Sequence, residues 1–79
     1  MLVRFYAVGR EIAGVDECRI DATSFFALAK ALESRFGARM VRLTDASTLL
    51  LDGTRHRIVD EVALSESDVV DLLPPFAGG

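Results

Sequence analysis

The chain has 79 residues, of which 51% are hydrophobic and 27% charged, and its formal net charge is −3. This length allows one domain with a small core and excludes two, and the composition is that of a globular chain rather than a disordered one. The nine Lys and Arg residues form no basic stripe, so the charge argues against a nucleic-acid partner and favours protein partners.

The cysteine content and the N-terminal sequence indicate in which cellular compartment the protein is expected. Cys18 is the only cysteine, so an internal disulfide is not possible. The opening MLVRFYAV lacks the features of a secretory leader, and no run approaches the roughly 20 apolar residues that span a bilayer. We therefore expect a cytoplasmic protein without a membrane partner.

The N-terminal segment is predicted to form a β-hairpin. Residues 2–7 (LVRFYA) alternate, so Tyr6 is expected on the face opposite to the core. The glycine-containing segment 9–14 is expected to be a turn, and residues 15–20 (VDECRI) a second strand. Val3, Phe5 and Ala7 are expected to share one face of the first strand, with Val3 and Phe5 in the core.

A helical period follows over residues 25–36. Thr23 or Ser24 is a suitable N-cap, and Gly37 suits a left-handed residue after the last turn. Phe26 lies toward the polar side, where it is either a half-covered aromatic, which we favour, or a contact for a partner. The residues expected to face the core are Phe25, Leu28, Leu32 and Phe36.

The second half of the chain is predicted to consist mainly of short strands. Residues 38–47 show no clear period and are expected to be an irregular connection. A turn is expected at Asp52-Gly53, and the last strand places Val70 and Leu72 on one face. The strands are expected at residues 48–51, 56–59 and 69–73. The element order predicts an α+β fold, with a helix covering one face of a mixed sheet.

The end of the sequence, PPFAGG, predicts an extended tail (residues 74–79) outside a domain of residues 1–73. Two consecutive prolines cannot donate to a β-ladder and favour an extended path, so such a tail reaches about 20 Å. Gly78 and Gly79 have no Cβ and pass where a side chain would clash, and a terminal carboxylate is ionised at neutral pH. A frayed terminus without a role is the simpler alternative.

Three segments resemble the molybdopterin synthase small subunit (MoaD), within the MoaD/ThiS ubiquitin-like sulfur-carrier family. LLPPFAGG is similar to that family's di-proline, two variable residues and terminal Gly-Gly. RFYAVGREIAG is similar to its opening strand followed by RExxG. LSESDVVDLLPP is similar to its approach to the tail, with Ser67 where glycine is usual and Val69 where glutamate is usual.

The resemblance implies a β-grasp (ubiquitin-like) fold. In it, one main helix packs across a mixed sheet of four to five strands, with the first and last strands parallel and adjacent at the centre. It also implies a sulfur carrier: an ATP-using, ubiquitin-activating-type enzyme (MoeB-like) adenylates the Gly79 carboxylate, and a persulfide donor supplies sulfur to give a thiocarboxylate.

The same resemblance implies the destination of the sulfur. The large catalytic subunit of molybdopterin synthase (MoaE-like) would pass it to a cyclic pyranopterin precursor during molybdenum cofactor biosynthesis. The chain itself would be a non-catalytic subunit that binds no cofactor. Gly79 carries the reacting carbonyl, and Gly78 passes a narrow tunnel in each partner.

A partner-binding surface is expected beside the tail. Strand parity places Tyr6 and Leu73 on the face away from the helix, where they form a small apolar patch. Ordinary surface apolarity is the alternative. The full set of expected partner contacts is Tyr6, Leu73, Pro74, Pro75, Phe76 and Ala77.

The remaining candidates point to no further chemistry. Cys18 is interpreted as a structural or surface thiol, because no helix N-terminus is expected nearby and no His or Lys is adjacent in sequence to activate it. His56 has no second ligand at metal-binding spacing, so no metal site is expected. Arg10 either contacts the activating enzyme or braces its turn.

Three alternative functions stay open. One is a sulfur carrier for another pathway, such as thiazole (thiamine) or cysteine synthesis. The second is a ubiquitin-like covalent protein modifier, for which Lys30, the only lysine, is the one side-chain acceptor on the chain itself. The third is a binding module whose tail has no role.

Overall fold

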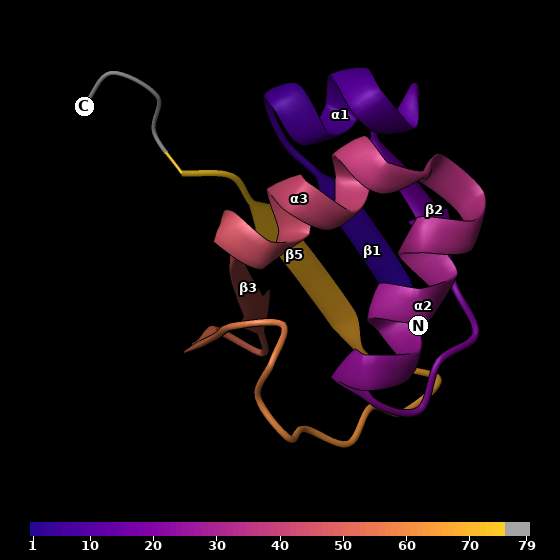
Figure 1. Cartoon of the computed structure of the whole chain (residues 1–79). Helices are drawn as coiled ribbons and strands as arrows, with labels where there is room; N and C mark the ends of the chain where they lie inside the picture. The colour runs from indigo at the N-terminus through magenta and orange to yellow at the C-terminus, as the bar shows by residue number, and fades with distance from the viewer. Residues whose placement is uncertain (76–79) are drawn as a thin grey trace.

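The computed structural model describes residues 1–75, which form an α+β domain of five strands and three helices (Figure 1). The strands are β1 (Leu2–Phe5), β2 (Glu17–Arg19), β3 (Thr48–Leu51), β4 (Thr54–His56) and β5 (Val69–Leu73). The helices are α1 (Val8–Ala13), α2 (Phe25–Phe36) and α3 (Ala38–Ala46). The predicted strand at residues 69–73 and helix at residues 25–36 are confirmed at both ends.

The strands form one mixed sheet in the order β2-β1-β5-β3-β4. β1 and β5 are parallel neighbours at its centre, with Phe5 opposite Leu72, and the other pairs are antiparallel. Helices α2 and α3 cover one face, and α1 lies near one end of the sheet (Figure 1). The predicted β-grasp arrangement is therefore confirmed, although α3 joins the main helix in covering the sheet.

The core lies between the sheet and the two covering helices. Val3 and Phe5 are 1% and 2% exposed, as predicted for the inward face of β1. The Phe36 ring at the end of α2 meets the Phe5 ring edge to face, with centroids 5.5 Å apart. The largest fully buried side chains are Phe5, Phe25, Leu28, Leu32, Met40, Leu49 and Leu72.

Helix α2 begins and ends where the sequence predicts. The Ser24 hydroxyl oxygen accepts a hydrogen bond from the Ala27 N–H at 3.1 Å, which satisfies one of the free donors of the first turn. Gly37 has φ +86°, which favours glycine, and it is also the N-cap residue of α3. Phe26 is 73% exposed, so the expectation of a half-covered ring is wrong.

The turn predicted at residues 9–14 is instead the short helix α1. Gly14 has φ +75°, and its N–H donates to the Arg10 carbonyl at 2.8 Å. Gly9 is buried, and a Cβ built on it would lie 3.4 Å from Leu43 Cδ2. α1 thus packs on α3 where Gly9 lies beside Leu43, and this packing stabilises a helix too short to form alone.

The strand predicted at residues 2–7 is shortened by α1. It ends at Phe5, and Ala7 is exposed at φ +50° rather than facing the core. The second strand is likewise limited to β2, which pairs with β1 as the predicted hairpin.

The connection expected at residues 38–47 is the helix α3. It buries Met40, and the Thr44 hydroxyl donates to the Met40 carbonyl at 2.7 Å. Because this hydroxyl is satisfied within the helix, a polar residue takes a buried position and hides the apolar period.

The predicted strand at residues 56–59 also shifts, to β4. Asp52 and Gly53 have φ of +51° and +79° and form a two-residue turn, so pairing resumes at once at Thr54.

Candidate functional site

The candidate site lies where β5 ends. β5 is hydrogen-bonded on both sides, to β1 and to β3, and its Val70 and Leu72 side chains are 0% and 1% exposed. Ladder pairing stops at Leu73, where Pro74 and Pro75 follow without N–H donors. The central strand therefore provides a rigid base for the segment that follows it.

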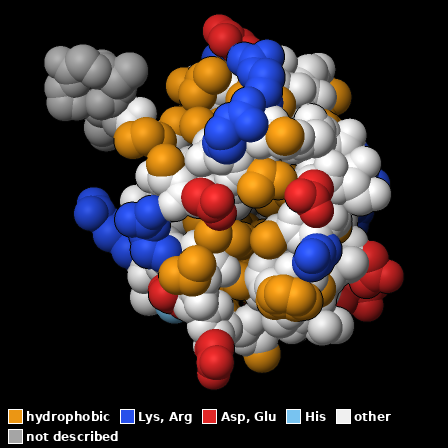
Figure 2. All heavy atoms as spheres, viewed as in Figure 1, with side chains coloured by type: hydrophobic (Ala, Val, Ile, Leu, Met, Phe, Trp, Pro, Cys, Tyr) orange, Lys and Arg blue, Asp and Glu red, His pale blue; other side chains and the backbone are white. Residues whose placement is uncertain are grey.

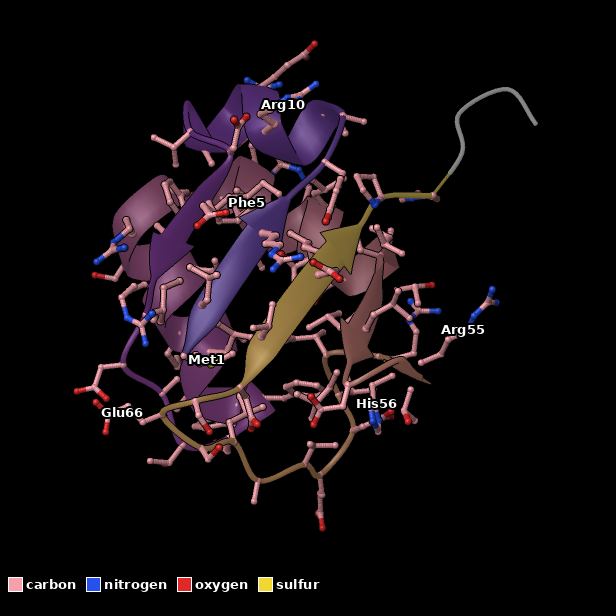
Figure 3. All side chains as sticks on the ribbon, turned by 180° about the vertical axis from the view of Figure 1, so that it is seen from behind. Met1, Phe5, Arg10, Arg55, His56 and Glu66 are labelled. Atoms are coloured by element: carbon pink, nitrogen blue, oxygen red, sulfur yellow. The ribbon has the colours of Figure 1, made fainter. Side chains whose placement is uncertain are left out.

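A hollow of about 560 Å³ opens beside this strand end, on the face of the sheet that α2 and α3 leave uncovered. We call it the tail-root hollow, and Figure 3 shows the uncovered face, with Arg55 projecting at its β4 edge. Its volume lies in the range of binding pockets. Its lining is mostly apolar and consists of Tyr6, Ala7, Val8, Thr48, Leu50, Arg55, Leu73, Pro74 and Pro75.

Tyr6 is held at the hollow by a hydrogen bond across the central strand pair. Its phenolic hydroxyl donates to Asp71 Oδ1 at 3.0 Å, and Tyr6 is 38% exposed. Asp71 occupies the same uncovered face of β5 as Leu73, because residues two apart in a strand share a face. The ring thus presents an apolar surface to the hollow while its polar end is satisfied.

The structure brings together four of the residues predicted to bind a partner. Tyr6, Leu73, Pro74 and Pro75 all line the tail-root hollow. Phe76, Ala77, Gly78 and Gly79 lie outside the described residues. The predicted patch is therefore present as geometry, and its role stays a prediction.

Five lining residues were not anticipated from the sequence: Ala7, Val8, Thr48, Leu50 and Arg55. Leu50 and Arg55 are cross-strand partners on the uncovered face. Apolar and polar residues do not alternate in the run TLLL, so the sequence pattern alone could not show which leucine faces away from the core. The pairing of β3 with β5 is what places Leu50 beside the hollow.

The other candidate residues lie apart from this hollow. Arg10 Nη1 is 3.7 Å from Asp16 Oδ1 in an exposed ion pair, which braces the connection between α1 and β2 only weakly. Cys18 lies opposite Val3 in the β1–β2 ladder and packs partly buried against the core. His56 Nδ1 is 3.3 Å from Asp60 Oδ2, and its ring meets Phe25 edge to face.

Residues 1–75 contain no cluster of three His, Cys, Asp or Glu side chains arranged to hold a metal ion. Within the same range no helix has the length and apolar character needed to cross a membrane.

Comparison with known proteins identifies the fold class. No protein-family model and no curated protein matches the sequence. Solved structures do match, and they show that the chain has the β-grasp fold, which it shares with small archaeal modifier proteins and a molybdopterin converting factor subunit. This is the fold that the sequence resemblance predicted.

Three similar structures are informative. Small archaeal modifier protein 1 (SAMP1) from Methanosarcina acetivorans is 22% identical, with a TM-score of 0.81 over 99% of this chain and 94% of that one. SAMP1 from Haloferax volcanii is 24% identical, with a TM-score of 0.80 over 100% and 98%. A provisionally assigned molybdopterin converting factor, subunit 1, from Pyrococcus furiosus is 24% identical, with a TM-score of 0.69 over 95% of each chain.

Proposed function

We propose that this chain is a ubiquitin-like carrier that acts through the carboxylate of Gly79, and specifically the sulfur-carrier subunit of a molybdopterin synthase. The observation that supports this most directly is the end of β5. A central strand paired on both sides stops at two prolines, beside an apolar hollow on the uncovered face. A fixed tail root next to a docking surface suits a carrier that presents its tail to successive partners.

In this proposal the chain supplies the reacting carbonyl and the partners supply the catalysis. An ATP-using adenylating enzyme converts the Gly79 carboxylate to an acyl-adenylate and releases pyrophosphate. A persulfide donor then displaces AMP, and reductive cleavage of the S–S bond by a thiol leaves a thiocarboxylate. The large synthase subunit transfers this sulfur to a cyclic pyranopterin precursor. We place this chemistry in the cytoplasm, where a chain with one cysteine stays reduced.

The tail-root hollow is the proposed contact for both partners. Tyr6 and Leu73 present apolar surface there, and Pro74 and Pro75 continue it toward the tail. Aromatic and aliphatic side chains grouped in a hollow are the usual anchors of a protein interface. Arg55 adds one cation to a mostly apolar lining and would fix the orientation of an acidic group on the partner.

A covalent protein modifier is the second candidate. The similarity in fold to two SAMP1 proteins, whose names describe modifiers, favours it specifically. Both candidates begin with adenylation of Gly79 and differ in the nucleophile that follows. In the modifier it is an amine, which forms an amide bond and releases AMP.

Intact mass of the 79-residue chain distinguishes the two candidates. The chain is incubated with ATP, an adenylating enzyme of this class, a persulfide donor and a reducing thiol, and a variant lacking Gly78 and Gly79 serves as control. Replacement of one oxygen by one sulfur in the intact chain alone supports the carrier. Conjugates of higher mass, lost in the deletion variant, support the modifier. An unchanged mass, with an enzyme shown to activate its own carrier, contradicts both.

The docking face is tested by the rate of ATP–pyrophosphate exchange. Tyr6→Ala and Leu73→Ala are expected to slow exchange by about tenfold, as loss of an interface anchor does. Val15→Ala, at an exposed apolar residue outside the hollow, should have no effect. Equal exchange rates for all three variants would show that the tail-root hollow does not contact the adenylating enzyme.

A further inference from the structure

A second hollow lies on the opposite side of the domain, between the start of α2, the end of α3 and the segment between β4 and β5. Its volume is about 730 Å³, and it shares no lining residue with the tail-root hollow. We call it the helix-side hollow. Figure 2 shows apolar side chains gathered on this face of the domain, with acidic and basic side chains around them. Its lining is Thr23, Ser24, Phe26, Ala29, Asp45 and residues 58–63.

Two large apolar side chains at this hollow are exposed to an unusual degree. Phe26 is 73% exposed and Val59 is 82% exposed, whereas Ile58, which also lines the hollow, is 6% exposed. Neither Phe26 nor Val59 contributes to the core cluster. Exposed apolar groups gathered around a hollow are typical of an interaction site, whereas single exposed apolar residues need no such explanation.

The walls of the hollow are tied together by hydrogen bonds. The Phe25 N–H donates to the Val62 carbonyl at 3.3 Å, and the Leu64 N–H donates to the Thr23 carbonyl at 2.9 Å. On the other side, the Arg57 guanidinium donates to the Asp45 carbonyl at the end of α3. The segment after β4 is thereby attached to both helices, so a partner would meet a surface that needs little rearrangement.

The charge around the hollow indicates which partner fits. Its lining contains the carboxylates of Asp45, Asp60 and Glu61 and no Lys or Arg. Asp60 accepts from the Arg57 N–H at 3.0 Å, while Asp45 and Glu61 make no ion pair within the described part of the chain. Two cations adjoin the hollow: Arg57, whose guanidinium donates to the Asp45 carbonyl, and Lys30, whose Nζ lies 5.6 Å from the centre of the Phe26 ring. Three carboxylates thus adjoin two cationic side chains, and the remaining negative charge favours a cationic partner.

From these observations we propose that the helix-side hollow binds a basic amphipathic segment of a protein partner. A bulky apolar side chain of that segment enters between Phe26 and Val59, and flanking Lys or Arg side chains pair with Asp45 and Glu61. An arginine can also stack on the exposed face of Phe26. A second copy of this chain fits poorly, because a symmetric contact would place the two acidic rims against each other.

This surface is independent of the function proposed above. Because the two hollows share no residues and lie on opposite faces, the segment binds while the tail root is occupied by another partner. The consequence is a carrier that is held by one protein while its tail is used by another, which raises the effective concentration of the tail at that enzyme.

The test uses a synthetic peptide with an apolar stripe of Leu and Phe flanked by Lys and Arg, titrated into the isotopically labelled 79-residue chain. Chemical-shift changes are expected at residues 23–29 and 58–63 and not at residues 48–50 or 71–73. A matched peptide with Glu in place of Lys and Arg should cause none. Changes spread evenly over the domain, or none at saturating cationic peptide, would overturn the proposal.

Variants at exposed positions keep the test free of folding effects. Phe26→Ser together with Val59→Ser should weaken peptide binding by at least about tenfold, and Asp45→Asn with Glu61→Gln should do so mainly at low salt. Val15→Ser, at 45% exposure and outside the hollow, is the matched control. Shifts at the hollow that grow with protein concentration alone would identify a second copy as the occupant and contradict the proposal.

Discussion

Tyr6 and Asp71 are 65 positions apart in sequence and joined by a hydrogen bond of 3.0 Å, from the phenolic hydroxyl to the carboxylate. The bond connects the segment just after β1 to the middle of β5, on the uncovered face of the sheet. It orients the Tyr6 ring toward Leu73 at the tail-root hollow. The two central strands thus share a side-chain contact at the end from which the tail departs.

Tyr6→Phe should lower the free energy of unfolding by less than about 1 kcal/mol, because the bond is exposed and water replaces it. Asp71→Asn should have a similarly small effect. A double-mutant cycle measured by urea denaturation should give a coupling energy of about 0.5 kcal/mol. Coupling of several kcal/mol would mean that the pair holds the central strands together rather than orienting a surface ring.

Ala7→Gly should stabilise the protein by about 1 kcal/mol. Ala7 has φ +50° and ψ −125°, a conformation that glycine adopts readily and alanine does not. Ala31→Gly, in the interior of α2, should instead destabilise by about 1 kcal/mol. Thermal or urea unfolding gives the change in the free energy of unfolding for each variant. Changes of the same sign at both positions would contradict the strained backbone conformation assigned to Ala7.

Leu28→Ala should destabilise the domain by about 2–5 kcal/mol. The Leu28 side chain lies on the buried face of α2 and is 0% exposed, so its loss leaves a cavity. Val59→Ala, at 82% exposure, should change the free energy of unfolding by less than about 0.5 kcal/mol. Chemical denaturation with far-UV circular dichroism measures both. A large loss at Val59 would show that this residue supports the fold, which would leave less reason to assign it a partner.

Amine-reactive reagents should modify Lys30 and leave the Met1 amine largely unmodified in the folded protein. The Met1 amine donates to the Ile20 carbonyl at 2.9 Å and is buried, while Lys30 is exposed. Peptide mapping of a brief labelling reaction measures the two sites.

The folded Lys30→Arg variant should therefore react hardly at all with the amine-reactive reagent. In denaturant it should react at one site, the exposed Met1 amine. Rapid labelling of Met1 in the folded protein would contradict the buried position of its amine. The result also bears on the modifier candidate, since it would limit self-conjugation to Lys30.

Helix α2 and strand β5 could be predicted from the sequence, because their patterns are local. The helical spacing from Phe25 to Phe36, with Ser24 and Gly37 at its ends, predicts α2 with the bounds it has. The alternation of VVDLL and the two prolines after it predict β5 and its end. Periodicity, capping residues and the missing N–H of proline act within a few residues, so no knowledge of the rest of the chain is needed.

The tertiary structure alone decided the elements and surfaces that depend on distant contacts. α1 exists where the sequence suggests a turn, because it packs on α3, where Gly9 lies beside Leu43. The tail-root hollow draws on β3, β4 and β5 and on the segment around Tyr6, and the helix-side hollow on α2, α3 and the segment after β4. Strand order and helix docking bring these segments together through the burial of one shared core, which is a property of the whole chain.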